Sequence, residues 1–325
     1  MSDALTRLLG TKDVVIADGA MGTNLFLLGL ANGAASELWN VEHPEKVRGI
    51  HQGFVDAGAE ILRTNTFGAT RFRFKLHRLE NRVRELNIAG AGIAREVADR
   101  AGRTVIVAGS IGPSGEMLEP LGTRTVMELE EVFLEQATAL KEGGIDVAWI
   151  ETMFANAELD AAIRAATRAG LPYVATMTFD SAGRTMMGVK PIDAMRHALG
   201  LSPAPIAFGA NCGIGPAQLL DSVLGLAEGA QGKMVIVAKA NGGLPVRGAD
   251  GSVRYDGTPE VMANYACLAR DAGARIIGGC CGTTAAHLRA MVDALATRPR
   301  GPAPTYVEIE HLVGSIKKVT AQPKT

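Results

Sequence analysis

Residues 274–296 read ARIIGGCCGTTAAHLRAMVDALA, which is a short apolar run, a glycine-rich turn with two cysteines and a segment of helical character. Seven other stretches of the chain begin with a similar run rich in β-branched residues. Nearly continuous apolar runs of this length are typical of parallel strands that are covered on both faces. The eight predicted strands are residues 14–19, 60–67, 104–112, 147–153, 172–180, 205–213, 234–243 and 274–282.

A longer segment rich in Ala, Leu, Arg and Glu follows each predicted strand. Several of these segments end in Ala-Gly or Gly-Gly, which is typical of a helix that terminates at a glycine. The predicted helices are residues 44–58, 79–101, 125–143, 156–170, 191–200, 216–228, 258–273 and 284–296.

Eight alternations of strand and helix predict an α/β protein with a (β/α)8 TIM barrel, because right-handed crossovers lead a parallel sheet of eight strands to close. A doubly wound open sheet is the alternative, and only the count of eight favours the closed form. The predicted barrel covers residues 1–298, and residues 299–325 form a short C-terminal extension with prolines, an amphipathic piece and a basic end. We expect this extension to be solvated or packed on a partner subunit of a homo-oligomer.

Composition and charge exclude several classes of protein. The 325 residues include 33 Lys and Arg against 34 Asp and Glu, a formal net charge of −1, so there is no electrostatic case for binding nucleic acid. Hydrophobic residues make up 47% and charged residues 21%, which is typical of a globular chain. Residues 1–13 lack the apolar core of a signal peptide, and charged residues interrupt every apolar run, so we expect a cytoplasmic protein without a membrane span.

The four cysteines are the strongest chemical signal. Cys212 lies in GANCGIGP, and Cys280 and Cys281 lie in GGCCGTT. The turns that hold these motifs follow two predicted strands and would be neighbours at the mouth of a barrel, so three thiols could converge there. Three soft ligands suit Zn²⁺, with a fourth position left open. Cys267 lies within a helical pattern, and we assign it to the core.

A cysteine at a strand end can also be a buried core residue or part of a disulfide. A free cysteine at a strand end is usually a small buried hydrophobe. A disulfide between Cys280 and Cys281 is disfavoured, because consecutive Cα atoms lie about 3.8 Å apart and disulfides need about 4.4–6.8 Å. The flanking Gly278, Gly279 and Gly282 favour the metal site, because they free the backbone to turn two successive thiols toward one ion.

A zinc ion with three thiolate ligands has a defined chemistry. Its net charge of −1 makes it a poor activator of water but an acceptor for a further thiol, and a coordinated thiol is deprotonated. The thiolate is the nucleophilic form of sulfur. The predicted reaction class is therefore the S-alkylation of a small thiol.

Polar residues at other strand ends describe the rest of the ligand. The segment DGAMGT at residues 18–23 offers backbone N–H groups to a carboxylate. Asp18 and Glu151, at the ends of different strands, could clamp one amine, and Thr64 and Asn65 add neutral hydrogen-bonding groups. For each residue the alternative is a capping or sealing role. Together with the thiols, the set describes a ligand with a carboxylate, an amine and a thiol.

Five motifs in this order, DGAMGT, TNTFGAT, GPSGE, GANCG and GGCCGT, resemble those of the zinc-dependent homocysteine S-methyltransferases. That family includes betaine–homocysteine and S-methylmethionine–homocysteine methyltransferases and the homocysteine module of cobalamin-dependent methionine synthase. The resemblance covers residues 14–296 and implies a barrel with zinc on Cys212, Cys280 and Cys281. It also implies Asp18 and Glu151 as catalytic residues, and contacts to homocysteine from Asp18, Gly19, Ala20, Met21, Thr64, Asn65, Glu151 and Asn211.

The methyl donor is less defined. The segment VEHPE at residues 41–45 resembles the betaine enzymes, but these carry an aromatic residue where this chain has Gly68. Aromatic faces hold quaternary ammonium groups, each worth about 0.5–2 kcal/mol, and Trp39, Phe67, Phe72 and Phe74 are nearby in sequence. The segment TNTFGA at residues 64–69 is similar to the corresponding segment of the methionine-synthase module. The expected donors are therefore betaine, S-methylmethionine, or a methyl group on a separate corrinoid or folate carrier protein. The alternative is a homocysteine-binding subunit of a split cobalamin-dependent methionine synthase, without turnover alone.

Overall fold

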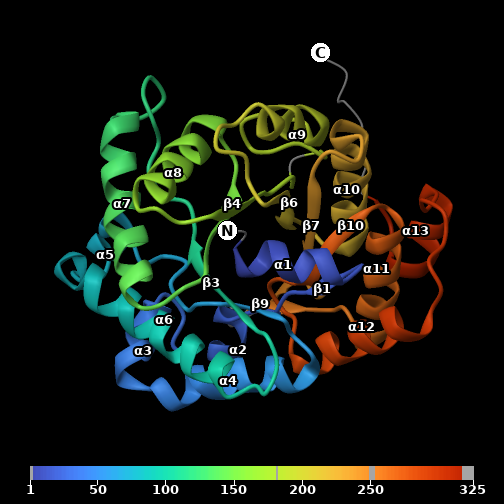
Figure 1. Ribbon diagram of the computed structural model, residues 1–325, viewed down its shortest axis with the longest axis horizontal. Helices are drawn as coiled ribbons and strands as arrows, with labels where there is room; N and C mark the ends of the chain where they lie inside the picture. The colour runs from blue at the N-terminus through green and yellow to red at the C-terminus, as the bar shows by residue number, and fades with distance from the viewer. Residues whose placement is uncertain (1–2, 181, 249–252, 317–325) are drawn as a thin grey trace.

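Eight parallel strands form the centre of the computed structural model, which describes residues 3–180, 182–248 and 253–316. Each strand lies within one of the eight predicted runs (Figure 1). The strands are β1 (Val15–Ile16), β2 (Ile61–Arg63), β3 (Ile106–Ile111), β4 (Val147–Met153), β5 (Tyr173–Met177), β6 (Ala207–Cys212), β7 (Val235–Ala240) and β10 (Ala274–Gly279).

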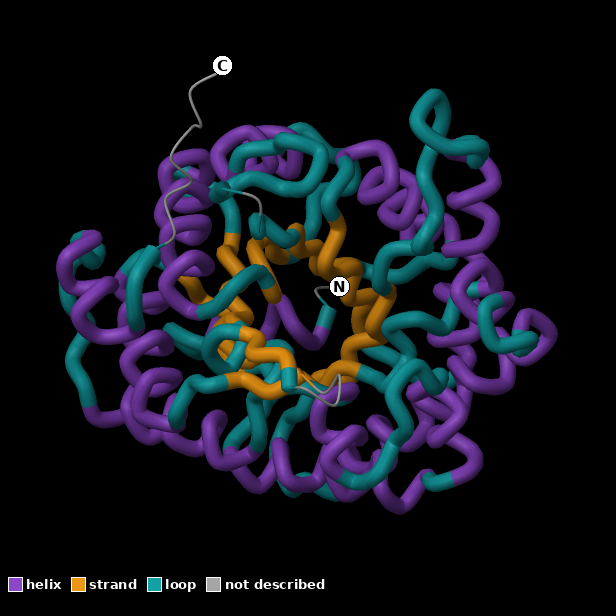
Figure 2. Tube along the Cα trace, turned by 180° about the vertical axis from the view of Figure 1, so that it is seen from behind, coloured by secondary structure: helices purple, strands orange, loops and turns teal. Residues whose placement is uncertain are grey.

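The sheet closes on itself. Its strand order is β1-β10-β7-β6-β5-β4-β3-β2, and a parallel bridge between Ala17 and Ile61 joins the two ends. At this seam the Asp18 N–H donates to the Ile61 carbonyl at 3.0 Å, and the Glu60 N–H donates to the Ile16 carbonyl at 2.7 Å. Figure 2 shows the strands as a ring inside the helices. The predicted (β/α)8 barrel is confirmed, and the doubly wound alternative is wrong.

Each predicted helical segment coincides with a helix of the outer layer, although α10 and α12 extend one or two residues beyond the predicted ends. The helices begin and end as their sequences indicate: Thr125 and Glu128 form a capping box, and Gly58 ends a helix with φ +109°. The outer helices are α4 (Pro44–Ala57), α6 (Val83–Asp99), α7 (Val126–Glu142), α8 (Asn156–Arg168), α9 (Pro191–Leu199), α10 (Pro216–Ala230), α11 (Pro259–Asp271) and α12 (Ala285–Thr297).

Several short elements were not predicted, because they are too short to give a periodic pattern. They lie in the connections that follow barrel strands, and a two-stranded antiparallel hairpin between β7 and α11 is one of them. These elements are α2 (Gly22–Leu27), η1 (Ser36–Leu38), α3 (Trp39–Glu42), α5 (Arg71–Lys75), η2 (Glu80–Arg82), β8 (Pro245–Arg247) and β9 (Val253–Tyr255).

An N-terminal helix covers the end of the barrel at which the strands begin. Helix α1 (Ala4–Thr11) lies across the centre of the ring in Figure 1. Its Leu5 and Leu9 are buried in a cluster with Val15, Ile61 and Val147, which point into the barrel. Apolar side chains thus fill the end at which the strands begin, and the polar side chains described below lie where the strands end.

The described part of the C-terminal extension packs one face on its own barrel. Helix α13 (Tyr306–Val313) lies beside α10 and α11 (Figure 1), and Ile309, Val313 and Ile316 are buried in the chain's own core. The Tyr306 hydroxyl donates to Asp221 Oδ1 of α10 at 2.9 Å. One face of the extension thus packs on the barrel helices of its own chain, while its other face, which includes Tyr306 and Val307, is exposed to solvent. The basic end lies outside the described residues.

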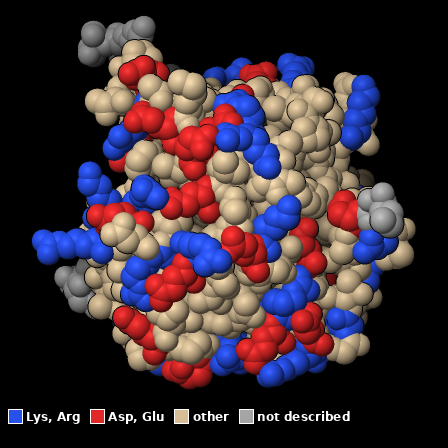
Figure 3. Space-filling view, turned by 60° about the vertical axis from the view of Figure 1, so that its left-hand side comes forward, with Lys and Arg blue, Asp and Glu red and all other residues tan. Residues whose placement is uncertain are grey.

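The surface carries charges of both signs. Figure 3 shows Lys and Arg intermixed with Asp and Glu on the face that it presents. Ion pairs link neighbouring helices, for example Arg84 with Glu142 at 2.6 Å and Arg164 with Glu130 at 2.8 Å. Within the described part of the chain, no helix is both long and apolar enough to cross a membrane.

Candidate metal centre and active site

Three cysteines meet at the mouth of the barrel. Cys212 is the last residue of β6, and Cys280 and Cys281 directly follow β10. The Sγ atom of Cys212 lies 3.1 Å from that of Cys280 and 3.7 Å from that of Cys281. All three Sγ atoms lie within 4.8 Å of one another and could hold a metal ion. Cys267 is buried elsewhere, in α11.

The backbone around these thiols has an uncommon conformation. Cys212 has φ +62°, in the left-handed region that residues with a Cβ atom rarely adopt. Gly282 has φ +79°, and a Cβ atom at this position would overlap the Tyr255 ring. Two features therefore require glycine at the position after the cysteine pair: the positive φ angle, and the close approach of Tyr255 on the hairpin.

The pKa values of the thiols shift in opposite directions. Hydrogen bonds from Cys212 and Cys281 lower the pKa of Cys280 well below its usual range, whereas the hydrogen bond to Cys280 raises the pKa of Cys212. A bound divalent cation would allow all three to be thiolates, because it supplies the missing positive charge.

A cavity of about 450 Å³ opens beside the thiols. Most residues that the sequence assigned to the site line it, namely Ala20, Met21, Thr64, Asn65, Glu151, Cys212, Cys280 and Cys281. Three others lie behind the wall. Asp18 and Asn211 are buried and do not line the cavity, and Gly19 offers its carbonyl to Arg63 at 2.6 Å.

Asn211 holds other site residues in place. Its Oδ1 accepts from the Thr152 N–H at 2.8 Å and from Thr176 Oγ1 at 2.6 Å. Its Nδ2 donates to Thr152 Oγ1 at 2.8 Å and lies 3.7 Å from Cys280 Sγ. Thr152, near the end of β4, has φ +64°, so Asn211 stabilises a strained residue of this strand as well as one thiol.

Thr64 and Asn65 reach the cavity, but their side chains also bind the protein. Asn65 Nδ2 donates to the Ser36 carbonyl at 2.8 Å and to Asn40 Oδ1 at 3.0 Å. Thr64 Oγ1 accepts from the Ser110 N–H at 3.0 Å. These bonds hold the end of β2 against its neighbours, which is the sealing role weighed from the sequence.

Arg63, which the sequence analysis missed, lies between Asp18 and Glu151. Its Nε donates to Asp18 Oδ1 at 2.8 Å, and its Nη1 donates to Glu151 Oε2 at 2.5 Å. Glu151 Oε1 also accepts from Ser110 Oγ at 2.6 Å. The two carboxylates come together as expected, but a guanidinium group occupies the place between them that the sequence analysis gave to an amine.

Lys239 of β7 is a second buried cation that sequence analysis missed. Its Nζ donates to Asp18 Oδ1 at 3.0 Å, and the side chain is fully buried. Burial lowers the pKa of Lys239 to about 8. Burial also favours the neutral form of Asp18, but the charges of Arg63 and Lys239 outweigh it and lower the pKa of this carboxyl. Burial raises the pKa of Glu151, and Arg63 opposes this change.

A signal for both cations was present in the sequence. Arg63 stands in the run EILRTNTF and Lys239 in MVIVAKANGG, and each is a charge within an otherwise apolar strand. Charged residues are almost never fully buried unless they are paired. Tyr255 gave no comparable signal. It reaches the cavity on the unpredicted hairpin, where its hydroxyl hydrogen-bonds to Cys281.

The family model for homocysteine S-methyltransferase matches residues 15–295, which include all of these groups. The chain belongs to the homocysteine S-methyltransferase family. It is 33% identical over 306 residues to a protein named methionine synthase from Mycobacterium tuberculosis, and 32% identical over 334 residues to one from Mycobacterium leprae. These matches cover 89% and 96% of this chain, which spans about a quarter of the length of either relative.

Solved structures of the family agree with the barrel. The chain superposes on the homocysteine methyltransferase MmuM from Escherichia coli, described as its metallated form, with a TM-score of 0.74 and 26% identity, covering 88% of this chain and 98% of that one. The oxidised form of MmuM gives a TM-score of 0.76 at 25% identity, covering 90% and 99%.

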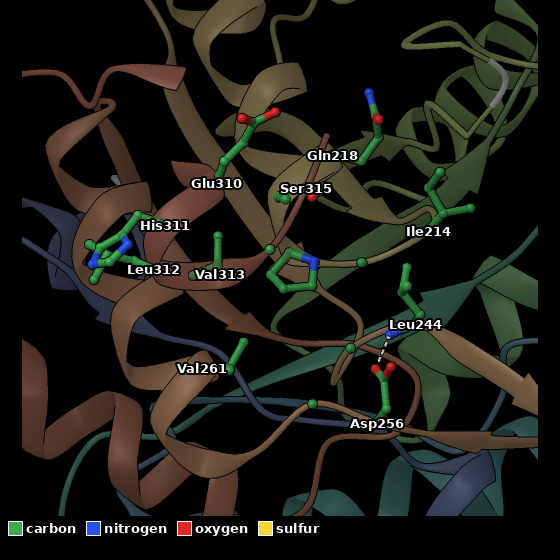
Figure 4. A pocket seen from close by; sticks show the side chains of 16 residues that line it. Ile214, Gln218, Leu244, Asp256, Val261, Glu310, His311, Leu312, Val313 and Ser315 are labelled. Carbon is green, nitrogen blue, oxygen red and sulfur yellow. Dashed lines mark hydrogen bonds between the residues drawn. The ribbon is translucent and has the colours of Figure 1, made fainter. Parts of the chain in front are cut away.

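A second cavity of this homocysteine S-methyltransferase family member, of about 390 Å³, lies between the start of α10 and the end of α13 (Figure 4). Leu244, Val261 and Val313 line it, and Asp256 accepts a hydrogen bond from the Leu244 N–H at 2.6 Å. No predicted site residue lines this cavity. The three thiols and the buried charges therefore locate the candidate active site in the first cavity.

His51 of α4 makes this family member sensitive to acid. Both ring nitrogens are buried without a hydrogen-bond partner among the described residues, and burial lowers the pKa of His51 to about 4. The unfolded chain binds this proton first as the pH falls below about 6.5. We therefore expect the folded state to lose about 2 kcal/mol relative to the unfolded state between pH 8 and pH 5.

The variant His51→Leu is expected to lose that part of the pH dependence. Urea denaturation at both pH values measures it, and His77→Leu, at an exposed histidine, is the matched control. Equal pH dependence in His51→Leu and the native chain would contradict the assignment.

Proposed function

We propose that this chain transfers a methyl group to the sulfur of homocysteine and forms methionine, with Zn²⁺ held by Cys212, Cys280 and Cys281. The observation that carries the proposal is the convergence of three thiols, within 4.8 Å, on the cavity of a barrel of this family. An all-sulfur set of three ligands fits zinc and leaves one position for a substrate sulfur. Reduced cysteines at the site fit the expected cytoplasmic location.

The chain's own residues hold and orient the reactants. When bound, zinc keeps a coordinated thiol deprotonated at neutral pH and thus nucleophilic. Asn211 holds Cys280 and the strained Thr152 at the end of β4, so the ligand set is pre-organised. In the transfer, the bond from sulfur to the methyl carbon forms as the bond from that carbon to the donor breaks, and the thiol proton leaves to solvent. Glu151 borders the cavity. Asp18 does not, but its carboxylate holds Arg63, which does border the cavity.

The donor remains a choice between small molecules and a carried methyl group. Betaine and S-methylmethionine are the small-molecule candidates. MmuM, named a homocysteine methyltransferase, is matched over 98% of its chain. The relatives named methionine synthase are about four times as long as this chain. Their match favours a second candidate, a homocysteine-binding subunit that needs a corrinoid or folate carrier protein.

One assay separates the two candidates. The purified, zinc-loaded chain is incubated with homocysteine and, separately, with betaine, S-methylmethionine or methylcobalamin, and methionine is quantified by mass spectrometry. We expect methionine with one of these donors, together with one zinc per chain. If none of the donors yields methionine although the chain still binds homocysteine, the methyltransferase proposal is wrong and the binding-subunit candidate takes its place. An active protein free of metal would overturn the zinc assignment.

A further inference from the structure

We infer that Thr23 and Asn24 of helix α2 are positioning residues for the metal site: they hold the turn of Cys280 and Cys281 so that two consecutive thiols face one ion. The inference rests on the metal site of the proposed function. It goes beyond that function because it assigns a role to a helix that supplies none of the three thiols.

The turn that carries the two thiols needs support from outside. Gly278, Gly279 and Gly282 surround the cysteine pair, and glycine loses more conformational freedom on folding than any other residue. A metal site requires its ligand atoms within about 0.2 Å of the proper distances. Contacts with other elements therefore decide whether this glycine-rich turn can hold an ion with a defined geometry.

Backbone hydrogen bonds fix one side of the turn. The Cys280 N–H donates to the Ala240 carbonyl at 2.6 Å, and the Gly242 N–H donates to the Cys281 carbonyl at 2.8 Å. These bonds continue the pairing of β10 with β7. They do not reach the two residues that follow the cysteine pair.

Helix α2 supplies the partners for those two residues. The Gly282 N–H donates to Thr23 Oγ1 at 3.1 Å, and this bond joins residues that are 259 positions apart in the sequence. Asn24 Nδ2 donates to the Thr283 carbonyl at 2.9 Å and to the Ala20 carbonyl at 2.7 Å. One side-chain amide thus joins the turn to the loop that follows β1.

Thr283 passes this support on to Cys280. Its Oγ1 accepts from the Ala20 N–H at 3.1 Å and donates to the Cys280 carbonyl at 2.6 Å. The Thr283 side chain is buried, and a Cβ atom at Gly279 would overlap it. The loop after β1, helix α2 and the turn with the thiols therefore form one hydrogen-bonded unit.

Helix α2 has little else to hold it in place. It has six residues and no side-chain cap, and Leu25 is its only buried residue. Leu27 is 76% exposed. A helix this short is not stable by itself in water. The bonds from Thr23 and Asn24 therefore stabilise the helix and the turn together.

The first test measures how fast the zinc-loaded chain loses its metal to an excess of a chromogenic chelator. Thr23→Val removes the hydroxyl that accepts from Gly282, and Asn24→Leu removes the bridging amide. Loss of a group that supports metal ligands costs about 10–100-fold in metal affinity. We therefore expect each variant to release zinc about tenfold faster, or more, than the native chain. Thr23→Ser keeps the hydroxyl and should release zinc at the native rate.

Two controls separate positioning from a general loss of structure. Asn264→Leu is the matched variant, because Asn264 Nδ2 also donates to a carbonyl of another helix, that of Leu312 at 3.3 Å, and it should release zinc at the native rate. Urea denaturation of the metal-free chains should give midpoints for Thr23→Val and Asn24→Leu within about 0.5 M of the native value. Native rates of zinc release in both variants, or a larger fall of both midpoints, would overturn the inference.

Hydrogen–deuterium exchange of the metal-free chain distinguishes failure of the inference from failure of the proposed function. Mass spectrometry follows peptides that cover residues 20–28 and 278–285. In Thr23→Val and Asn24→Leu we expect both peptides to exchange about tenfold faster than in the native chain, because a supporting hydrogen bond is lost. If this result is found but the native chain holds no zinc, the proposed function alone fails. Native exchange in both variants overturns the inference even if the chain methylates homocysteine.

Discussion

Replacing Cys280 by serine is expected to abolish metal binding and to lower the rate of methyl transfer by about a thousandfold or more. A serine hydroxyl is a poor zinc ligand, because the ion prefers thiolate sulfur among the ligands available at this site. Cys280 is also the thiol with the lowered pKa and the one nearest to Cys212. Metal activation of a substrate supplies several kcal/mol, and each factor of ten in rate corresponds to about 1.4 kcal/mol.

The chain offers a matched control for this substitution. Cys267→Ser also replaces a buried cysteine, but this residue packs against Ala263 and Ala294 in the outer layer. Metal content per chain is measured by plasma mass spectrometry, and methionine formation by the assay described above. Cys267→Ser should keep one zinc and most of the activity. Full metal content and normal turnover in Cys280→Ser would rule out the three-thiol site.

Arg63→Met is expected to lower the free energy of unfolding by about 3–5 kcal/mol. The substitution removes one partner of a buried charge pair, and the carboxylates of Asp18 and Glu151 are then left with fewer partners in a site that excludes water. Lys239 and Ser110 remain as donors, so the fold should persist at reduced stability.

Two further variants show whether this cost comes from the buried charges. Arg84→Met breaks an ion pair whose side chains are 72% and 41% exposed, and it should cost less than about 1 kcal/mol. The double variant Arg63→Met with Glu151→Leu removes the orphaned carboxylate and should recover part of the loss. Chemical denaturation monitored by circular dichroism measures all three. Equal losses for Arg63→Met and Arg84→Met would contradict the buried network.

The fold could be predicted because its signals are local and repeated. Each barrel strand is a nearly continuous apolar run, and each outer helix has a periodic face, so eight units of the same kind define the architecture. The count of eight favoured a closed barrel over an open sheet, and the bridge between Ala17 and Ile61 shows the closure. Helix α1 and the hairpin that carries Tyr255 are each too short to give a period, and their positions depend on contacts with distant strands.

The site was predictable where chemistry is carried by residue type. Cys212, Cys280 and Cys281 combine a soft ligand with glycine-rich turns at the ends of two strands, and only one strand, β7, separates these two strands in the barrel. The roles of Asp18 and Glu151 were not predictable in the same way, because a carboxylate at a strand end binds whichever cation is nearest. That cation is Arg63, which the sequence places inside a strand and which only the closed barrel brings between the two carboxylates.

The seam of the barrel has one consequence for ligand binding. Strand β1 contributes two residues, and the bond from the Arg63 N–H to Asp18 Oδ2, at 2.8 Å, extends the few hydrogen bonds between β1 and β2. Arg63 also lines the cavity, so a ligand that fills the cavity packs against the residue that links the first strand to the second. Occupancy of the cavity and local breathing of the ring are thus opposed, so amide protons at this junction should exchange with deuterium more slowly when substrate is present.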